Sequence, residues 1–210
     1  MTSPAARTGD ELSLTPLAGL STFSNPYYQN PLSLGASAVV HSATKYLGGH
    51  SDVLGGVIVT ADPTLLARFR FLQNANGNVP SPFDCWLLIR SLKTLTVRSR
   101  EHGLNGLKVA RGLQEVGVPA GLVRDVRYPG LHREVETIGE RRERELAWQQ
   151  MTPEAKKWAA RQGFSVESQG GFPSGGMVSF HIHSEEEASQ ENSAGAERFL
   201  ESLHLFAREL

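Results

Sequence analysis

The sequence predicts an α/β protein, because segments with strand and helix patterns alternate along the chain. Two short runs rich in β-branched residues, Ala38–Val40 and Val57–Thr60, are typical of buried strands. After the second run, apolar residues recur at helical spacing through much of residues 62–116. Residues 122–128 then alternate apolar and polar side chains, as a half-buried strand does.

The loop between the first two predicted strands concentrates residues that suit phosphate and carbonyl chemistry. It carries Ser42, Thr44 and Lys45, followed by the glycine pairs at 48–49 and 55–56. The two hydroxyls can donate hydrogen bonds to phosphate oxygens, and the glycines allow backbone to approach closely. Lys45 can form an imine with a carbonyl group. The spacing alone also fits an ordinary solvated loop lysine.

Helix signals follow the second strand. Asp62 can cap a helix whose first residue is Pro63 and which ends near Gly77. Ser81 can cap the next helix. We expect one long helix over residues 81–118, broken or kinked near residues 103–106, where two glycines occur.

The composition argues against several classes of function. The chain has 210 residues, of which 40% are hydrophobic and 20% charged, and its net charge of −1 argues against a nucleic-acid or anionic-membrane partner. No apolar run approaches the ~20 residues that span a bilayer. Residues 1–16 lack an apolar signal-peptide core. The single cysteine, Cys85, fits a reducing compartment, so we expect a cytoplasmic protein.

Two stretches around Lys45 resemble a known enzyme family. Residues 22–32 (TFSNPYYQNPL) and 40–53 (VHSATKYLGGHSDV) are similar to the cofactor-lysine region of the pyridoxal-phosphate enzymes of cysteine and methionine metabolism. The resemblance implies pyridoxal 5'-phosphate as cofactor, held as a covalent imine at Lys45, with Ser42 and Thr44 binding its phosphate. No metal site is expected, because His41, His50 and Asp52 form only a short polar cluster.

The resemblance also implies a domain organisation. Residues 21–80 correspond to the C-terminal part of a fold-type-I cofactor-binding (large) domain, residues 81–118 to a long connecting helix and residues 119–210 to a partial α+β C-terminal domain. We expect residues 1–20 to be an unrelated or disordered lead-in. The C-terminal domain carries an insertion at about 132–174, interpreted as a solvated surface excursion.

Further elements are expected in the C-terminal part. Thr152 can cap a surface helix, residues 175–182 match a Gly-Gly-Met-x-Ser-Phe strand of the family, and residues 194–206 have helical spacing.

The chain departs from the family at Leu20. The resemblance implies an aspartate there, which would pair with the protonated pyridine nitrogen of the cofactor, and leucine cannot replace it. Upstream cofactor-binding segments and a downstream arginine for the substrate carboxylate have no counterparts here. We therefore expect an interior portion of a longer enzyme, truncated at both ends.

Within the family that the chain resembles, the function that the resemblance favours is that of cystathionine γ-lyase, which releases cysteine from cystathionine. Cystathionine γ-synthase, cystathionine β-lyase and methionine γ-lyase stay open as alternatives, as does a non-catalytic fragment that associates with full-length subunits. Expected partners are a sulfur amino acid such as cystathionine and further subunits of an oligomer. The Ser42-x-x-Lys45 spacing also matches a serine-acylating motif, but glycines follow almost at once where that motif requires a helix.

Overall fold

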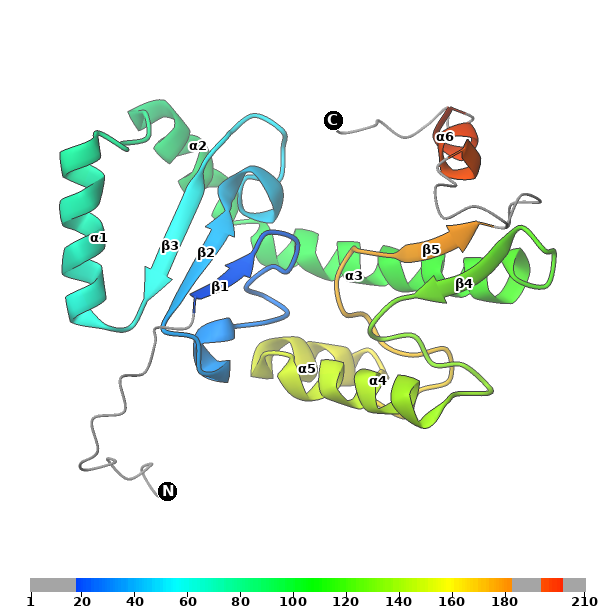
Figure 1. Ribbon diagram of the computed structural model, residues 1–210. Coiled ribbons are helices and arrows are strands. Elements are labelled where there is room, and N and C mark those ends of the chain that lie inside the picture. Colours follow the sequence, from blue (N-terminus) through cyan, green and yellow to red (C-terminus); the bar gives the residue numbers. More distant parts are fainter. Residues whose placement is uncertain (1–17, 183–193, 202–210) are drawn as a thin grey trace, which may run out of the picture.

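The computed structural model describes residues 18–182 and 194–201, and it is mixed helix and strand (Figure 1). A three-stranded sheet lies at one end of the molecule and a two-stranded sheet at the other, with helix α3 (Leu95–Gly112) running from one to the other. Helices α4 (Ile138–Gln150) and α5 (Pro153–Arg161) lie along one side of this arrangement.

The three-stranded sheet has the order β1-β2-β3. Strand β1 (Ala18–Ser21) is parallel to β2 (Ala38–Ser42), which is antiparallel to β3 (Gly56–Thr60). The 3₁₀ turn Pro31–Leu34 lies between β1 and β2. Both strands predicted around the Lys45 loop are therefore present. Of the lead-in expected over residues 1–20 to be unrelated or disordered, residues 18–20 are ordered, because their backbone pairs with β2; residues 1–17 lie outside the described part.

Helix α1 (Pro63–Asn76) begins and ends where the sequence predicts. The Asp62 carboxylate accepts hydrogen bonds from the backbone of Thr64 and Leu65, at 2.7 and 3.3 Å, and so caps the first turn. Gly77 ends the helix with φ of 68°, a left-handed conformation that suits glycine.

The expected single helix over residues 81–118 is instead divided. Helix α2 (Pro82–Leu92) ends before Thr94, α3 begins at Leu95, and a short π-helical turn follows at Leu113–Gly117. The break lies near Arg98, whose side chain donates to Ser91 O and to the hydroxyl of Thr94 and so satisfies groups freed where α2 stops.

The kink predicted near residues 103–106 is absent, since α3 runs through both glycines. These two glycines lie instead where other parts of the chain approach α3 closely. A Cβ at Gly103 would lie 1.9 Å from the Tyr28 hydroxyl, and one at Gly106 would lie 2.5 Å from Gly175 O.

The two-stranded sheet joins β4 (Val123–Arg127) and β5 (Ser179–Ile182) in antiparallel pairing. The sequence predicts both strands but not their pairing. Its inner side chains pack against α3 in a core formed by Leu107, Ala110, Val123, Val126, Tyr128 and Leu131. Helix α6 (Ala194–Glu201) covers the first part of the predicted helix 194–206, and the remainder lies outside the described residues.

The segment 132–174 is not the solvated excursion that its charge suggests. The Thr137 hydroxyl and the Glu140 carboxylate form a reciprocal capping box at the start of α4, and Thr152 caps α5. One face of α5 is buried through Ala155 and Ala159, and the packing continues in a second core with Tyr27, Tyr28, Met151 and Phe172.

A buried ion pair completes this segment. Arg144 is only 3% exposed, and its guanidinium donates two hydrogen bonds of 3.0 Å to the carboxylate of Glu136. Burial alone would raise the pKa of Glu136, but the hydrogen bonds from Arg144 and from the Arg133 backbone outweigh it and lower that pKa. Two charged side chains of this charge-rich segment, Arg144 and Glu136, therefore lie in the protein interior.

Within the described residues, no helix combines the length and apolar character needed to cross a bilayer.

Candidate active site

The loop that carries Lys45 is a kinked helical turn between two strands. Strand β2 ends at Ser42, the π-helical turn Ala43–Leu47 follows, and β3 begins at Gly56. At Lys45 the backbone adopts φ −87° and ψ −115°, which interrupts the helical geometry. The turn is closed by hydrogen bonds of 2.7 Å from Gly48 N to Ala43 O and from Gly49 N to Lys45 O. The lysine thus lies on a tightly closed turn at the end of a strand.

The two predicted phosphate-binding hydroxyls flank this kink. The Ser42 side chain makes no capping hydrogen bond to the turn. The Thr44 hydroxyl oxygen accepts a hydrogen bond of 3.1 Å from Gly55 N, which fixes the side chain and leaves its own proton available to donate. Ser42, Thr44 and Lys45 are therefore carried together on one short segment, each partly exposed.

Arg98 connects the lysine turn to the helices, and the sequence analysis did not identify it. Its Nη1 donates to Tyr46 O at 2.9 Å, and its Nη2 donates to Ser91 O at 3.0 Å. Gly49 has φ of 70°, and a Cβ there would lie 2.0 Å from Arg98 Nη1. The glycine therefore makes room for the guanidinium, a relation that only the folded chain reveals.

Two further contacts hold the same turn. His50 Nδ1 lies 2.7 Å from Gly48 O, which requires the proton on that nitrogen, and 3.2 Å from the Ser91 hydroxyl. The Tyr46 ring stands edge-on to His102 of α3, with 5.4 Å between the ring centroids. Burial raises the pKa of Tyr46, opposed by a hydrogen bond with the backbone of Gly176. The turn is thus held by contacts with Ser91 of α2, with His102 of α3 and with Gly176, which precedes β5.

Leu20 lies on the same face of the sheet as the Ser42 side chain. It pairs in register with Val40, and side chains two residues apart on a strand share a face. Leu20 is 83% exposed, and β1, with the sequence AGLS, carries no carboxylate. The position at which the family resemblance implies an acid is therefore an exposed apolar side chain.

The histidines considered as metal ligands have other roles. His41 is buried, and its Nδ1 lies 3.3 Å from Ser21 O, which links β2 to β1. His50 contacts Gly48 as described above. No group of three or more potential His, Cys, Asp or Glu ligands occurs in the described ranges 18–182 and 194–201.

Comparison with known proteins places this geometry in a family. The sequence pattern of the family described as "Cys/Met metabolism PLP-dependent enzyme" matches residues 20–151, more than half of the chain. A probable cystathionine gamma-synthase of Herpetosiphon aurantiacus is 52% identical over 111 residues, which cover 53% of this chain and 34% of that protein. The cystathionine gamma-lyase of Sus scrofa is 41% identical over 186 residues, covering 89% of this chain and 36% of the relative.

Solved structures agree with these matches. The crystal structure of cystathionine gamma synthase from Xanthomonas oryzae pv. oryzae, in complex with aminoacrylate and cysteine, has a TM-score of 0.69 at 30% identity and covers 94% of this chain and 42% of that one. The cystathionine gamma-lyase structure from yeast has a TM-score of 0.61 at 38% identity, covering 80% of this chain and 36% of that one. The chain spans about a third of the length of the curated relatives it matches. It belongs to the pyridoxal-phosphate-dependent enzyme family of cysteine and methionine metabolism.

Proposed function

We propose that this chain carries the lysine site of a transsulfuration enzyme, a carbon-sulfur lyase that acts as cystathionine γ-lyase and releases cysteine from cystathionine. The observation that carries the proposal is the grouping of Ser42, Thr44 and Lys45 on one kinked turn clamped by Arg98. Relatives with lyase and synthase names both match, so the choice of the lyase belongs to the proposal.

The residues of the turn fit the phosphate and the reactive carbon of pyridoxal phosphate. When bound, this cofactor supplies an electron sink for a carbanion at the substrate. The free hydroxyl proton of Thr44 can be donated to a phosphate oxygen, as can that of Ser42. The Lys45 amine would hold the cofactor through its carbonyl carbon and would take and return protons at the substrate carbons.

The fit is incomplete at the pyridine nitrogen. A carboxylate beside that nitrogen would keep it protonated, whereas Leu20 presents only methyl groups on its face of β1. We therefore expect weaker cofactor retention and slower turnover than an aspartate at this position would give.

The direct test measures cysteine released from cystathionine by the purified chain supplied with pyridoxal phosphate. Lys45→Ala should abolish the release, whereas Lys108→Ala, at an exposed position of α3, should leave it unchanged. When the chain is supplied with cysteine and an activated ester of homoserine instead, formation of cystathionine with release of the ester's acid would favour the γ-synthase alternative. Equal cysteine release by the Lys45→Ala variant would contradict the proposal.

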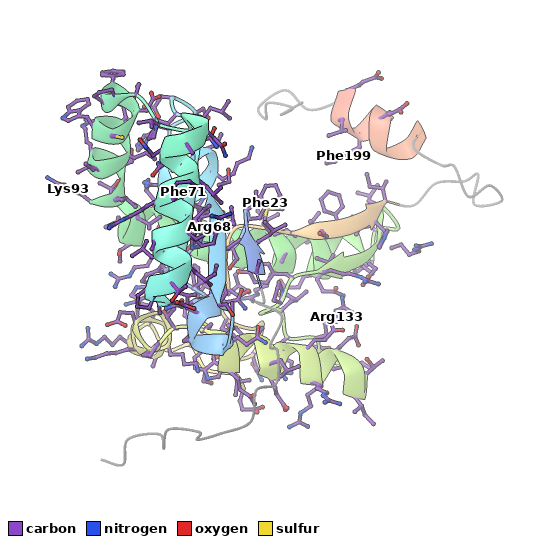
Figure 2. The ribbon with its side chains drawn as sticks, turned by 60° about the vertical axis from the view of Figure 1, so that its left-hand side comes forward. Phe23, Arg68, Phe71, Lys93, Arg133 and Phe199 are labelled. Atoms are coloured by element: carbon purple, nitrogen blue, oxygen red, sulfur yellow. The ribbon has the colours of Figure 1, made fainter. Side chains whose placement is uncertain are left out.

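A second candidate function is association with a longer subunit of the same family. Apolar side chains are exposed on both the sheet and the helices that follow it: Leu20 is 83% exposed, Ile58 50%, Phe71 60% and Trp86 56%. Figure 2 shows α1 in the foreground, with Phe71 and Arg68 on it; the Arg68 guanidinium lies 5.5 Å from the centre of the Phe71 ring. Such exposed apolar area favours a protein partner.

Sedimentation velocity tests this association, with the chain alone and mixed with a full-length cystathionine γ-lyase. Co-sedimentation that weakens in Trp86→Ser supports the candidate. A chain that sediments as a monomer both alone and in the mixture contradicts the candidate.

A further inference from the structure

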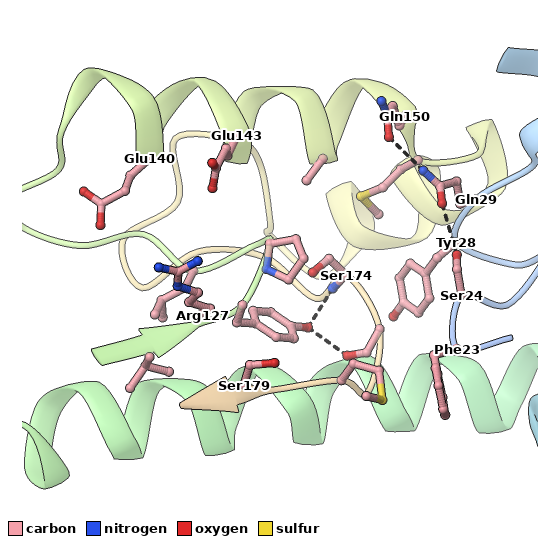
Figure 3. Close-up of a pocket in the computed structure, with 18 of the residues that line it drawn as sticks. Phe23, Ser24, Tyr28, Gln29, Arg127, Glu140, Glu143, Gln150, Ser174 and Ser179 are labelled. Atoms are coloured by element: carbon pink, nitrogen blue, oxygen red, sulfur yellow. Dashed lines mark hydrogen bonds between the residues drawn. The ribbon is translucent and has the colours of Figure 1, made fainter. Parts of the chain in front are cut away.

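A cleft of about 730 Å³ lies between α4 and the β4–β5 sheet (Figure 3). One wall is a single face of α4, formed by residues 140, 143, 147 and 150, which recur at helical spacing, and Glu136 precedes this helix. The loop after β1, at Ser24 and Tyr28, closes one end. Ser42, Thr44 and Lys45 do not line this cleft, so it is separate from the candidate active site.

The outer end of the cleft holds charges that are already paired. Arg133 donates to Asp125 at 2.9 Å and also contacts Glu140, and Arg127 lies 3.2 Å from Asp125. Glu136 is bound by Arg144, as described above. These carboxylates have partners within the chain and do not call for a ligand.

Glu143 differs from these neighbours. The structure gives it no hydrogen bond or ion pair with any described residue, and Figure 3 shows its carboxylate on the cleft side of α4. An unpaired carboxylate on the wall of a cleft is a position for a cationic group.

The inner end holds hydroxyls that lack partners. Tyr28 is only 4% exposed, and neither its hydroxyl nor that of Ser174 has a hydrogen-bond partner. Buried polar atoms in folded proteins are nearly always hydrogen-bonded. Both residues line the cleft, so a ligand bound there can supply the missing acceptor. The nearby Tyr128 hydroxyl is fully engaged, with Ser174 N at 2.8 Å and Gly175 O at 3.0 Å.

The electrostatic character of the inner end suits a negatively charged acceptor. Its lining side chains, from Ser24 to Gln29 and at Gln150, Met151, Ser174 and Met177, include no carboxylate. Burial raises the pKa of Tyr28, and the positive charge of Arg100 lowers that pKa by a smaller amount. The hydroxyl therefore stays protonated and can donate.

We propose that this cleft binds a small linear zwitterion, with its ammonium group at Glu143 and its carboxylate at the hydroxyls of Tyr28 and Ser174. Ala147 of α4 and Met151, which follows the helix, form the apolar wall along which a methylene chain would lie. The chemical class is that of ω-amino acids. The site uses α4 and the loop after β1, and it stands independently of the chemistry at Lys45.

Isothermal titration calorimetry with a series of chain lengths tests this site. The probes are glycine, β-alanine, 4-aminobutyrate and 6-aminohexanoate, with acetate and methylamine as single-charge controls. One of the zwitterions should bind at least tenfold tighter than either control. Glu143→Gln and Tyr28→Phe should each weaken that binding at least tenfold, whereas Glu145→Gln, whose carboxylate pairs with Arg141 on the same helix, should not.

The variants are chosen to keep the fold. Tyr28→Phe removes a hydroxyl that has no partner, and Glu143→Gln keeps the shape of an exposed side chain, so both should unfold at the temperature of the parent chain. Absence of saturable heat with every zwitterion would overturn the proposal. So would acetate binding as tightly as the zwitterions, or binding that survives the Glu143→Gln change.

Discussion

The turn that carries Lys45 and the segment 132–174 are stabilised in different ways. Hydrogen bonds to main-chain atoms hold the turn: Arg98 donates to Tyr46 O, and the Thr44 hydroxyl accepts from Gly55 N. The side chains of Ser42, Thr44 and Lys45 remain partly exposed. The segment 132–174 is held by buried side chains, including the Arg144–Glu136 pair and the alanines of α5. A reactive loop thus keeps its side chains available because main-chain contacts fix its shape.

The largest loss of stability is expected when one member of the buried Arg144–Glu136 ion pair is replaced. Arg144→Met leaves the Glu136 carboxylate, 10% exposed, without its ionic partner, and removing one member of such a pair costs about 3–5 kcal/mol. Urea unfolding should show this loss. Arg141→Met, whose side chain is 61% exposed and pairs with Glu145, should cost less than about 1 kcal/mol.

A double variant sharpens the same point. Arg144→Met with Glu136→Leu removes both charges, so most of the stability lost by the single change should return. Equal losses for Arg144→Met and Arg141→Met would show that α4 is the surface helix its sequence suggests.

Arg98→Met tests the main-chain clamp on the lysine turn. The change removes hydrogen bonds to Tyr46 O and Ser91 O, and we expect a loss of about 2 kcal/mol in unfolding free energy. Retention of pyridoxal phosphate, measured by equilibrium dialysis, should weaken about tenfold, equivalent to about 1.4 kcal/mol. Arg90→Met, at an exposed position of α2, serves as the control. Unchanged retention in Arg98→Met would mean that the turn keeps its shape without the clamp.

Leu20→Asp should improve the site. The side chain is 83% exposed, so the substitution costs little packing, and it places a carboxylate on the face shared with Ser42. We expect roughly tenfold tighter pyridoxal phosphate binding, about 1.4 kcal/mol. Leu20→Asn has a similar shape without the charge and should not reproduce the gain. Equal effects of the two substitutions would argue against a role for charge at this position.

The smallest effect is a dependence of stability on pH in the segment around α4. The pKa of Glu136 is lowered, as is that of Glu140, where hydrogen bonds from Thr137 act most strongly. A carboxyl with a lowered folded pKa adds stability above its ordinary pKa of about 4, and that stability is lost as the pH falls through the folded value. The urea midpoint should therefore drop between about pH 5 and pH 3, less steeply in the Arg144→Met, Glu136→Leu double variant. An equal drop of the urea midpoint with pH in the parent chain and in the double variant would contradict the assignment of this pH dependence to Glu136.

The features that were predicted correctly from the sequence depend on residues close together in the chain. The caps at Asp62, Ser81 and Thr152 and the left-handed glycine at position 77 are local, and the structure has each of them. The grouping of Ser42 with Lys45 was equally local, since Lys45 lies only three positions after Ser42, on the turn that follows β2.

Features that depend on distant residues escaped prediction. Arg98 reaches Tyr46 across 52 positions, and the Thr152 hydroxyl meets Tyr27 O across 125. Arg144 lies in a run of charges that is typical of a solvated helix, so only its partner Glu136 and the fold around it reveal that it is buried. The glycines at 103 and 106 suggested a kink because the sequence does not show that Tyr28 and Gly175 pack against them.

The central claim, that the Lys45 turn still holds the cofactor, is tested most directly by the visible absorbance of lysine-bound pyridoxal phosphate. The purified chain is incubated with the cofactor, dialysed and scanned beside Lys45→Ala and Lys108→Ala. We expect a visible band in the parent chain and in Lys108→Ala that is absent from Lys45→Ala. A folded parent chain without the band, or a band of equal height in Lys45→Ala, would contradict the claim.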